Sequence, residues 1–489
     1  MERRKPTYGE SIASLLVMVL FIFVGFMLFK LRVELLMIAS AAAAGFLAWR
    51  LGYTWEDMET AICHRIMRAT PAILIIWVIG IVISTLMFSG SIPMLIYYGI
   101  KIVDPQYVII AAFFTCMVFS TVTGTSWGSA GTAGVAFMGV AAGLDVPLSV
   151  TAAAVICGAT FGDKLSPLSE TTNLAPACVG INLYDHIKAM MWTTLPATAV
   201  AFVVFFLAGN SLTITATELP PEALELTDTL EQMFRWSPLL LVPFLFILGG
   251  AIMKKPPVPT MLLGSLAAII IGMAYQGFSV QSGVLAALNG FDISMVTADG
   301  FDPAAAPASI ATLMNRGGMK SMVGVVIIIY CGYAYAAIIS KAGFLETAIR
   351  PLAERVKSRG AVMAATLFTE LLLLVFSGNS YTGAIMVPEM FKRSFLESGM
   401  GLKALSRTIE DIGTIVAPLV PWGSSGAFYA GALGVTIFGS GGYAPWCVTC
   451  YVTPVIALLL AVTGVGVYRM NAEEKDSALK KYELEQAAL

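Results

Sequence analysis

Long apolar segments separated by short polar ones follow one another along almost the whole chain of 489 residues. Many reach or approach the roughly 20 residues that a helix needs to cross a lipid bilayer. Because they are continuous rather than alternating, they indicate membrane helices and not the strands of a β-barrel. Eight full spans are predicted, at about 11–29, 33–51, 71–89, 184–208, 237–253, 257–275, 322–340 and 446–468.

Two pairs of shorter apolar segments each surround a polar, glycine-containing string. The first pair, 106–143, encloses TVTGTSWGSAG, and the second, 360–397, encloses FSGNSYTG. Because the arms are short for full crossings, each pair is predicted to form a re-entrant hairpin.

A proline-containing, hydroxyl-rich segment follows each hairpin, at 148–181 and at 405–438. Proline removes a backbone donor and interrupts a helix. Interrupted helices at membrane depth are tolerated only where they are buried in protein or line a wet cavity. Both segments are therefore predicted to be broken helices that cross the membrane.

The two halves of the chain are related. Residues 113–129 align with 367–383 without a gap, and four positions are identical: Phe114 and Phe368, Thr115 and Thr369, Gly124 and Gly378, Ser126 and Ser380. Both halves also share the order of spans, hairpin, broken helix and span. Five full crossings in each half are an odd number, so the second repeat is predicted to be inverted relative to the first, as in secondary transporters.

The distribution of Lys and Arg places both termini in the cytoplasm, because short cytoplasmic loops are enriched in these residues. The predicted organisation is a cytoplasmic N-terminus (1–10), a first repeat (11–208), an extracytoplasmic loop (209–235), a second repeat (236–470) and a cytoplasmic tail (471–489). Residues 52–69 are predicted to form an amphipathic helix on the membrane surface.

Composition agrees with an all-α polytopic membrane protein and excludes several other classes. The chain is 57% hydrophobic and 12% charged, about half the charge of a soluble domain. The first apolar segment is long and lacks a small-residue cleavage site, so no cleaved signal peptide is expected. Seven scattered cysteines argue against a disulfide framework. The sequence contains no paired-histidine motif and no phosphate-binding loop motif, so it indicates neither a metalloenzyme nor an ATPase. A net charge of −2 suggests no nucleic-acid partner.

Hydroxyl and carboxyl side chains gather at the hairpin tips and broken helices. Na⁺ is a hard cation that prefers oxygen ligands. A first ion or substrate site is predicted at Thr123, Thr125, Ser126, Ser129, Asp163, Ser166, Ser169, Thr171 and Thr172. By the repeat, a second is predicted at Ser377, Asn379, Ser380, Thr382, Ser424 and Ser425. The proposed Na⁺ ligands among these are Asp163, Thr125, Ser126, Asn379 and Ser380.

Exchange of Na⁺ for a proton needs a group that can hold either, and a buried carboxylate can do so. Asp163 is the first candidate, with Glu370 and Glu170 as further ones. Alternatively, Lys164 pairs with Asp163 or Glu170, which would make Asp163 structural. Arg407 has the i+3 and i+4 spacing to pair on a helix surface with Glu410 or Asp411.

Three strings resemble the NhaC-type sodium/proton antiporter family: GDKLSPLSETTNLAPA (162–177), NRGGMKSM (315–322) and LSRTIEDIGTIVAPLVPWG (405–423). The resemblance implies two hairpins and two broken helices, a fixed scaffold domain beside a moving transport domain, a homodimer, and Na⁺ rather than an organic cofactor. It also implies a plasma membrane, here a bacterial inner membrane. The sequence departs from the family pattern at Gly423, Ser424 and Ser425.

The favoured function is Na⁺/H⁺ antiport by alternating access, without enzymatic activity. The alternative is a Na⁺-coupled carrier of a small organic anion, of the malate or lactate type, or of an amino acid. A free arginine at the site would favour that carrier, and Arg407 is the only candidate within the motifs. An intramembrane enzyme using Ser166 and Lys164, or a channel, is a weaker alternative.

Overall fold

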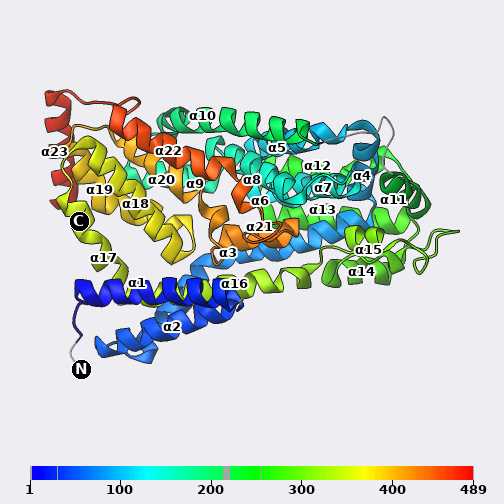
Figure 1. The fold of residues 1–489 in the computed structure, drawn as a ribbon, viewed down its shortest axis with the longest axis horizontal. Helices are drawn as coiled ribbons and strands as arrows, with labels where there is room; N and C mark the ends of the chain where they lie inside the picture. The colour runs from blue at the N-terminus through cyan, green and yellow to red at the C-terminus, as the bar shows by residue number, and fades with distance from the viewer. Residues whose placement is uncertain (1–2, 30, 213–220, 254, 488–489) are drawn as a thin grey trace.

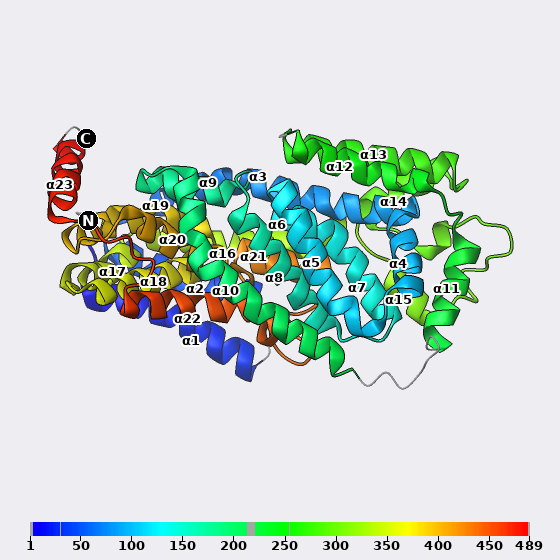
Figure 2. The same ribbon diagram turned by 90° about the horizontal axis from the view of Figure 1, so that it is seen from above.

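The computed structural model describes residues 3–29, 31–212, 221–253 and 255–487. Within these residues the protein is helical, and the only extended pairing is an isolated antiparallel bridge between Met400 and Arg469. The helices form an elongated bundle, and both termini lie at the same end of it (Figure 1). The N-terminal helices α1 (Tyr8–Ile22) and α2 (Val33–Arg50) lie side by side at that end in both views (Figure 2).

Nine helices in the described part of the chain are long and apolar enough to cross a membrane. Besides α1 and α2 they are α3 (Trp55–Phe88), α5 (Pro105–Thr123), α8 (Leu148–Leu165), α10 (Leu183–Asn210), α13 (Pro257–Ala274), α16 (Val323–Lys341) and α18 (Arg359–Ser377). A tenth span results if α11 (Pro221–Met233) and α12 (Val242–Ile252), bent by 98° at their junction, count as one. The prediction of a polytopic all-α membrane protein is confirmed.

The surface helix predicted at 52–69 is wrong as a separate element, because it forms the first half of α3. Thr54 caps this helix: its hydroxyl accepts from the Asp57 backbone N–H, and the Asp57 carboxylate accepts from the Thr54 N–H. Pro71 lies inside α3 without ending it. Arg65 and Arg68 of this segment line a cavity of the bundle, while Glu56 and Glu59 are exposed.

Each predicted hairpin forms a sharp reversal at a glycine. α5 ends at Gly124 (φ 70°), and the chain returns through α6 (Ser126–Ser129), a π-helical turn and α7 (Val135–Gly143). α18 ends at Gly378 (φ 72°), and the chain returns through α19 (Ser380–Glu397). Glycine adopts this left-handed conformation without a steric cost. The outgoing arms are longer than expected, since α5 and α18 each meet the length for a full span.

Both predicted broken helices are interrupted. The first consists of α8 and α9 (Glu170–Val179), with Pro167 in the break. The second consists of α20 (Leu402–Gly413) and α21 (Ser424–Leu433), separated by a segment that contains Pro418 and Pro421.

The hairpin tips lie against these breaks. A Cβ atom added at Gly124 would come within 2.6 Å of Leu168 Cβ, and one at Gly378 within 3.3 Å of the Trp422 carbonyl oxygen. The fold thus places two sharp turns and two interrupted helices next to one another in the protein interior.

One constant shift along the chain relates the corresponding helices. Residues 105, 148 and 170 begin α5, α8 and α9, while 359, 402 and 424 begin α18, α20 and α21. The same shift relates Gly180 and Gly434, which end α9 and α21 with φ values of 84° and 71°. The gap-free alignment of the hairpins therefore extends to helix boundaries downstream of them.

The remaining segments are partly helical. The segment 276–320 contains α14 (Val280–Asn289) and α15 (Ala308–Met314). The predicted loop 209–235 contains α11, while 213–220 lie outside the described residues. The other helices are α4 (Ser91–Ile102), α17 (Phe344–Arg355), α22 (Val448–Thr463) and α23 (Ala472–Ala487).

Close glycine contacts hold the bundle together at two places. Gly158 on α8 faces α5 so tightly that a Cβ there would lie 2.2 Å from the Phe113 carbonyl oxygen. In the NRGGMKSM string, the Gly318 N–H donates to the Gly80 carbonyl of α3 at 2.7 Å. Backbones approach this closely only where a side chain is missing, so this string serves packing against α3.

Candidate functional site

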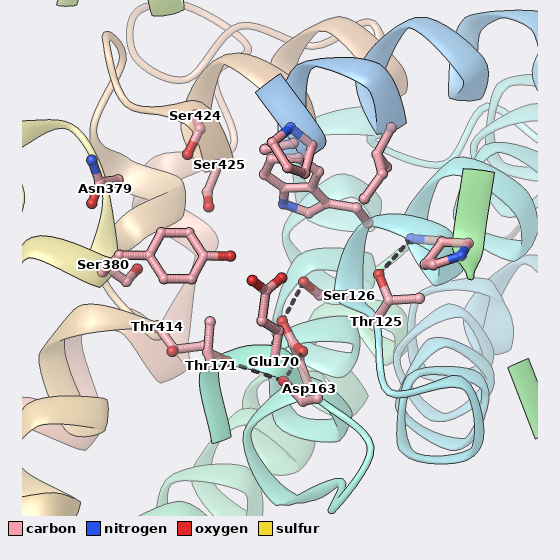
Figure 3. A pocket seen from close by; sticks show the side chains of 18 of the residues that line it. Thr125, Ser126, Asp163, Glu170, Thr171, Asn379, Ser380, Thr414, Ser424 and Ser425 are labelled. Carbon is pink, nitrogen blue, oxygen red and sulfur yellow. Dashed lines mark hydrogen bonds between the residues drawn. The ribbon is translucent and has the colours of Figure 1, made fainter. Parts of the chain in front are cut away.

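A cavity of about 950 Å³ lies where the two hairpin tips, the two breaks, α3 and α16 come together. Many of the side chains predicted as site residues line it: Thr123, Thr125, Ser126, Asp163, Ser169, Glu170, Thr171, Asn379, Ser380, Thr382, Ser424 and Ser425. Figure 3 shows Asn379, Ser380, Ser424 and Ser425 on one side and Thr125, Ser126 and Asp163 on the other. The fold therefore merges the two predicted sites into one chamber.

Asp163 is the centre of the first-half cluster. It lies on the last turn of α8, just before the break. The Ser126 hydroxyl of the hairpin tip donates to Asp163 Oδ2 at 2.7 Å, and the Ser169 hydroxyl of the break donates to Oδ1 at 2.6 Å. Asp163 is half-buried, and the carboxylate has access to the cavity. Two sequence-distant hydroxyls and one carboxylate thus form a compact oxygen cluster on the cavity wall.

Three further oxygen groups extend this cluster. The hydroxyls of Ser169 and Thr171 lie 3.1 Å apart, and Glu170 between them is exposed to the cavity at the first turn of α9. Thr125 caps the return arm of the hairpin by accepting from the Gly128 N–H. The cluster therefore carries two carboxyl groups, Asp163 and Glu170, beside neutral oxygen ligands.

The second-half cluster contains no carboxylate, and its side chains mostly bond locally. Asn379 caps α19 by accepting from the Thr382 N–H at 3.1 Å, and the Thr382 hydroxyl donates to the same oxygen. The Ser380 hydroxyl donates to the Gly413 carbonyl at the end of α20. The position of Glu170 in the first half corresponds, by the constant shift, to Ser424 in the second. The two ends of the cavity thus differ in charge.

Several predicted site residues do not line the cavity but hold its walls. Ser129 donates to the Thr125 carbonyl, Thr172 donates to the Asp163 carbonyl, and Ser377 donates to the Asn379 carbonyl. The Ser166 hydroxyl accepts from the Leu168 N–H. The Thr172 and Ser166 hydroxyls supply hydrogen bonds within the first break, and the Ser129 and Ser377 hydroxyls supply them at the two hairpin tips.

Glu370 also lies away from the cavity lining. Its side chain is fully buried, and neither carboxyl oxygen has a hydrogen-bond partner in the described structure. The carboxyl group is packed against two glycines: a Cβ at Gly383 would come within 2.0 Å of Oε1, and one at Gly413 within 2.8 Å. An isolated carboxylate anion is costly to bury, so the neutral acid is the form that suits this position.

Lys164 pairs with neither of its predicted partners, Asp163 or Glu170. Its ammonium group contacts Asp411 Oδ1 at 2.5 Å, and both side chains are fully buried. Arg407 does pair with Asp411, at 3.6 Å, as its i+4 spacing predicted. The location was wrong, however, because this pair is buried between helices instead of lying on a helix surface. Asp163 is therefore left free of any ion pair among the described residues.

The basic groups on α3 were not among the predicted site residues. His64, Arg65 and Arg68 line the cavity. The Arg65 guanidinium donates through Nη2 to the Ser377 carbonyl and to the Thr382 hydroxyl, both at 3.1 Å, and lies 5.5 Å from the ring of Tyr333. Its buried Nε has no hydrogen-bond partner, and no described carboxylate forms an ion pair with it. A signal was available, since basic residues at helical spacing run directly into a predicted span.

Comparisons of the amino-acid sequence with known proteins give matches over nearly the whole chain. Residues 99–172 and 158–465 match the model of the Na⁺/H⁺ antiporter family. A protein of Haemophilus influenzae named an uncharacterized Na⁺/H⁺ antiporter is 39% identical over 96% of this chain and 98% of its own length. The Na⁺/H⁺ antiporter NhaC of Alkalihalophilus pseudofirmus is 32% identical over 95% and 97%. A malate-2H⁺/Na⁺-lactate antiporter of Bacillus subtilis is 32% identical over 95% and 96%.

Proposed function

The chain belongs to the Na⁺/H⁺ antiporter family, whose members are multi-pass membrane transporters and not enzymes, and we propose that it exchanges Na⁺ for protons at Asp163. The single observation that carries the assignment is the Asp163 cluster, in which a carboxylate on the cavity wall accepts from Ser126 and Ser169. No other carboxyl group in the described part of the chain combines access to the cavity with hydroxyls from two different elements.

The chemistry of exchange follows from these contacts. Hydroxyl and carboxylate oxygens are ligands that a hard monovalent cation accepts. When Na⁺ is bound, the ionised carboxylate neutralises its charge, and Ser126 and Ser169 turn their oxygen lone pairs toward the ion. When Na⁺ leaves, a proton on Asp163 restores neutrality in a site that is poorly solvated. The two cations therefore compete for one group, which is the requirement for antiport.

Alternating access at a single site accounts for the architecture. The constant shift between α5, α8 and α9 and their counterparts α18, α20 and α21 supports two repeats. In an inverted arrangement, the hairpins and broken helices form a transport domain, and the remaining spans form the scaffold of a homodimer. We place both termini in the cytoplasm on the strength of the Lys and Arg distribution. The bacterial origin of the similar antiporters supports a bacterial plasma membrane.

Proteoliposomes with an internal pH dye test this assignment. An imposed Na⁺ gradient without any organic solute is expected to move protons in the wild-type protein and not in Asp163→Asn. Asp185→Asn is the matched control, because Asp185 is partly exposed and pairs with Lys403 away from the cavity. Proton movement that survives in Asp163→Asn would contradict the role of Asp163, and a wild-type protein inert to Na⁺ would contradict antiport.

One observation favours a second function, a Na⁺-coupled carrier of a small organic anion. Arg65 provides a half-buried cation without a carboxylate partner among the described residues, in a cavity of about 950 Å³ that is far larger than a Na⁺ ion requires. Guanidinium groups bind carboxylates well, and a similar Bacillus subtilis protein is named for malate and lactate. This second function holds if two results are found together. Na⁺-driven flux must need lactate, malate or an amino acid, and Arg65→Gln must either remove that requirement or abolish the flux.

A further inference from the structure

A tyrosine of the second broken helix reaches the cavity without a hydrogen-bond partner. Tyr429 lies on α21, is 1% exposed, and lines the cavity together with Ser126 and Asp163. Its hydroxyl forms no hydrogen bond in the described structure. A buried tyrosine usually pairs this group, as Tyr443 does by donating to the Pro418 carbonyl at 2.7 Å.

The position of Tyr429 is fixed by packing between the halves. The neighbouring Phe428 stacks on Trp127 of the first hairpin tip, with ring centroids 4.8 Å apart. Further along α21, Leu433 lies near Gly134 of the same hairpin, since a Cβ there would be 3.5 Å from it. α21 of the second half is thus anchored along the return arm of the first hairpin. This contact brings Tyr429 to the wall that carries the Asp163 cluster.

Burial without a partner does not by itself define a ligand. Tyr335 on α16 also has an unpartnered hydroxyl and is 0% exposed, and both tyrosines belong to hydrophobic core clusters, but Tyr335 does not line the cavity. What distinguishes Tyr429 is that it lines the chamber that Ser126, Ser169 and Asp163 also line, so its unpaired hydroxyl belongs to a residue of the cavity wall. A buried hydroxyl without a partner costs free energy, and a cation bound beside the Tyr429 hydroxyl would supply the missing partner.

We propose that the Tyr429 hydroxyl is a ligand of the transported Na⁺ and completes the first-half site from the other half of the protein. The inference rests on the proposed function, because it assumes that Na⁺ binds at Asp163. The phenol supplies a neutral oxygen, so the charge balance between Na⁺ and a proton at Asp163 is unchanged. Na⁺ then holds α21 against the first hairpin, and the complete site exists only while both broken helices face it.

The consequence for transport is specific. Loss of the hydroxyl weakens Na⁺ binding but leaves the carboxylate that carries the proton. Tyr429→Phe is therefore expected to raise the Na⁺ concentration for half-maximal exchange by about tenfold, roughly the effect of losing one buried polar contact. The maximal rate at saturating Na⁺ is expected to stay within about twofold.

The experiment is a Na⁺ titration of proteoliposomes containing wild type, Tyr429→Phe or Tyr335→Phe. Tyr335→Phe is the matched control, because it deletes the same buried, unpartnered hydroxyl outside the cavity. The Na⁺-dependent rise in melting temperature of the purified proteins in detergent gives a second reading that needs no transport. The melting temperature without Na⁺ shows whether each variant is folded.

A shift of the Na⁺ midpoint in Tyr429→Phe alone, in both measurements, supports the inference. Identical midpoints in Tyr429→Phe and wild type overturn it, while leaving antiport at Asp163 intact. An equal shift in Tyr335→Phe also overturns it, because the effect then belongs to core packing. The proposed function is judged separately, by the response of wild type and Asp163→Asn to Na⁺.

Discussion

Lys164 Nζ lies 2.5 Å from Asp411 Oδ1, and both side chains are fully buried. The contact joins the last turn of α8 to α20, and so connects the two broken helices directly. Thr193 of α10 donates to the same Asp411 oxygen at 2.6 Å, and Arg407 lies 3.6 Å from Oδ2. Lys164 is next to Asp163 in the chain, but its ammonium group forms a structural contact between the two broken helices and is not part of the proposed ion site.

Removing the Lys164 ammonium is expected to destabilise the protein strongly. In Lys164→Met, Asp411 loses its closest positive partner and keeps only the longer contact with Arg407. Breaking a buried ion pair on one side costs about 3–5 kcal/mol. Thermal unfolding in detergent measures the loss. The double variant Lys164→Met/Asp411→Leu is expected to recover none of it, because it also takes from the buried Arg407 its carboxylate partner, and a single variant as stable as wild type would show that the pair contributes nothing.

The hydroxyls on Asp163 are expected to tune Na⁺ affinity rather than stability. Ser126→Ala and Ser169→Ala each remove one hydrogen bond to the carboxylate, and with it one proposed ligand. Each is expected to raise the Na⁺ concentration for half-maximal exchange by about tenfold or more, since such bonds contribute about 1.5–3 kcal/mol when one partner is charged and about 1.4 kcal/mol corresponds to tenfold.

Thr121→Ala is the control for these two variants. Its hydroxyl bonds the Met117 carbonyl of its own helix, and the residue does not line the cavity. If the Na⁺ titrations of both serine variants match that of wild type, Ser126 and Ser169 are not ligands of Na⁺.

Glu370 is expected to be dispensable for coupling. Because its carboxyl group does not line the cavity and has no hydrogen-bond partner in the described structure, Na⁺ cannot compete with a proton there without a rearrangement. Glu370→Gln, which has nearly the same shape and no charge, is expected to keep Na⁺-driven proton movement near the wild-type level. If this variant instead loses exchange as Asp163→Asn does, the proton-carrying role moves to Glu370.

The contact between α5 and α8 depends on Gly158. An alanine Cβ there would lie 2.2 Å from the Phe113 carbonyl oxygen, which is backbone and cannot turn aside. Overpacking of this kind costs about 1–3 kcal/mol, more than the roughly 1 kcal/mol that alanine gains over glycine in a helix.

Gly158→Ala is therefore expected to lower the melting temperature. Gly324→Ala on α16, where nothing lies within 4 Å of the new Cβ, is expected to leave it unchanged or raise it slightly. If the two alanine variants have the same melting temperature, α5 and α8 can move apart at little cost in free energy.

Much of the fold could be predicted because membrane helices satisfy their own backbone hydrogen bonds. Long apolar segments in the sequence therefore mark them without information on packing. Glycines at positions 124 and 378 and prolines such as Pro167 and Pro418 mark the turns and breaks locally. The amphipathic segment at 52–69 was misassigned for a related reason. A polar helix face is the same in sequence whether it meets lipid headgroups or an internal cavity, and only packing distinguishes them.

The amino-acid sequence by itself determined which residues are available for chemistry: Asp163, the serines around it, and the hydroxyls of both hairpins. Only the tertiary structure decided which of them act together. Lys164 could pair with Asp163 by proximity in the chain, but in the folded protein it forms its ion pair with Asp411 of α20. Arg65 on α3 and Tyr429 on α21 line the cavity although neither was among the predicted site residues. Contacts between distant elements depend on how whole helices pack, and local patterns carry no record of that packing.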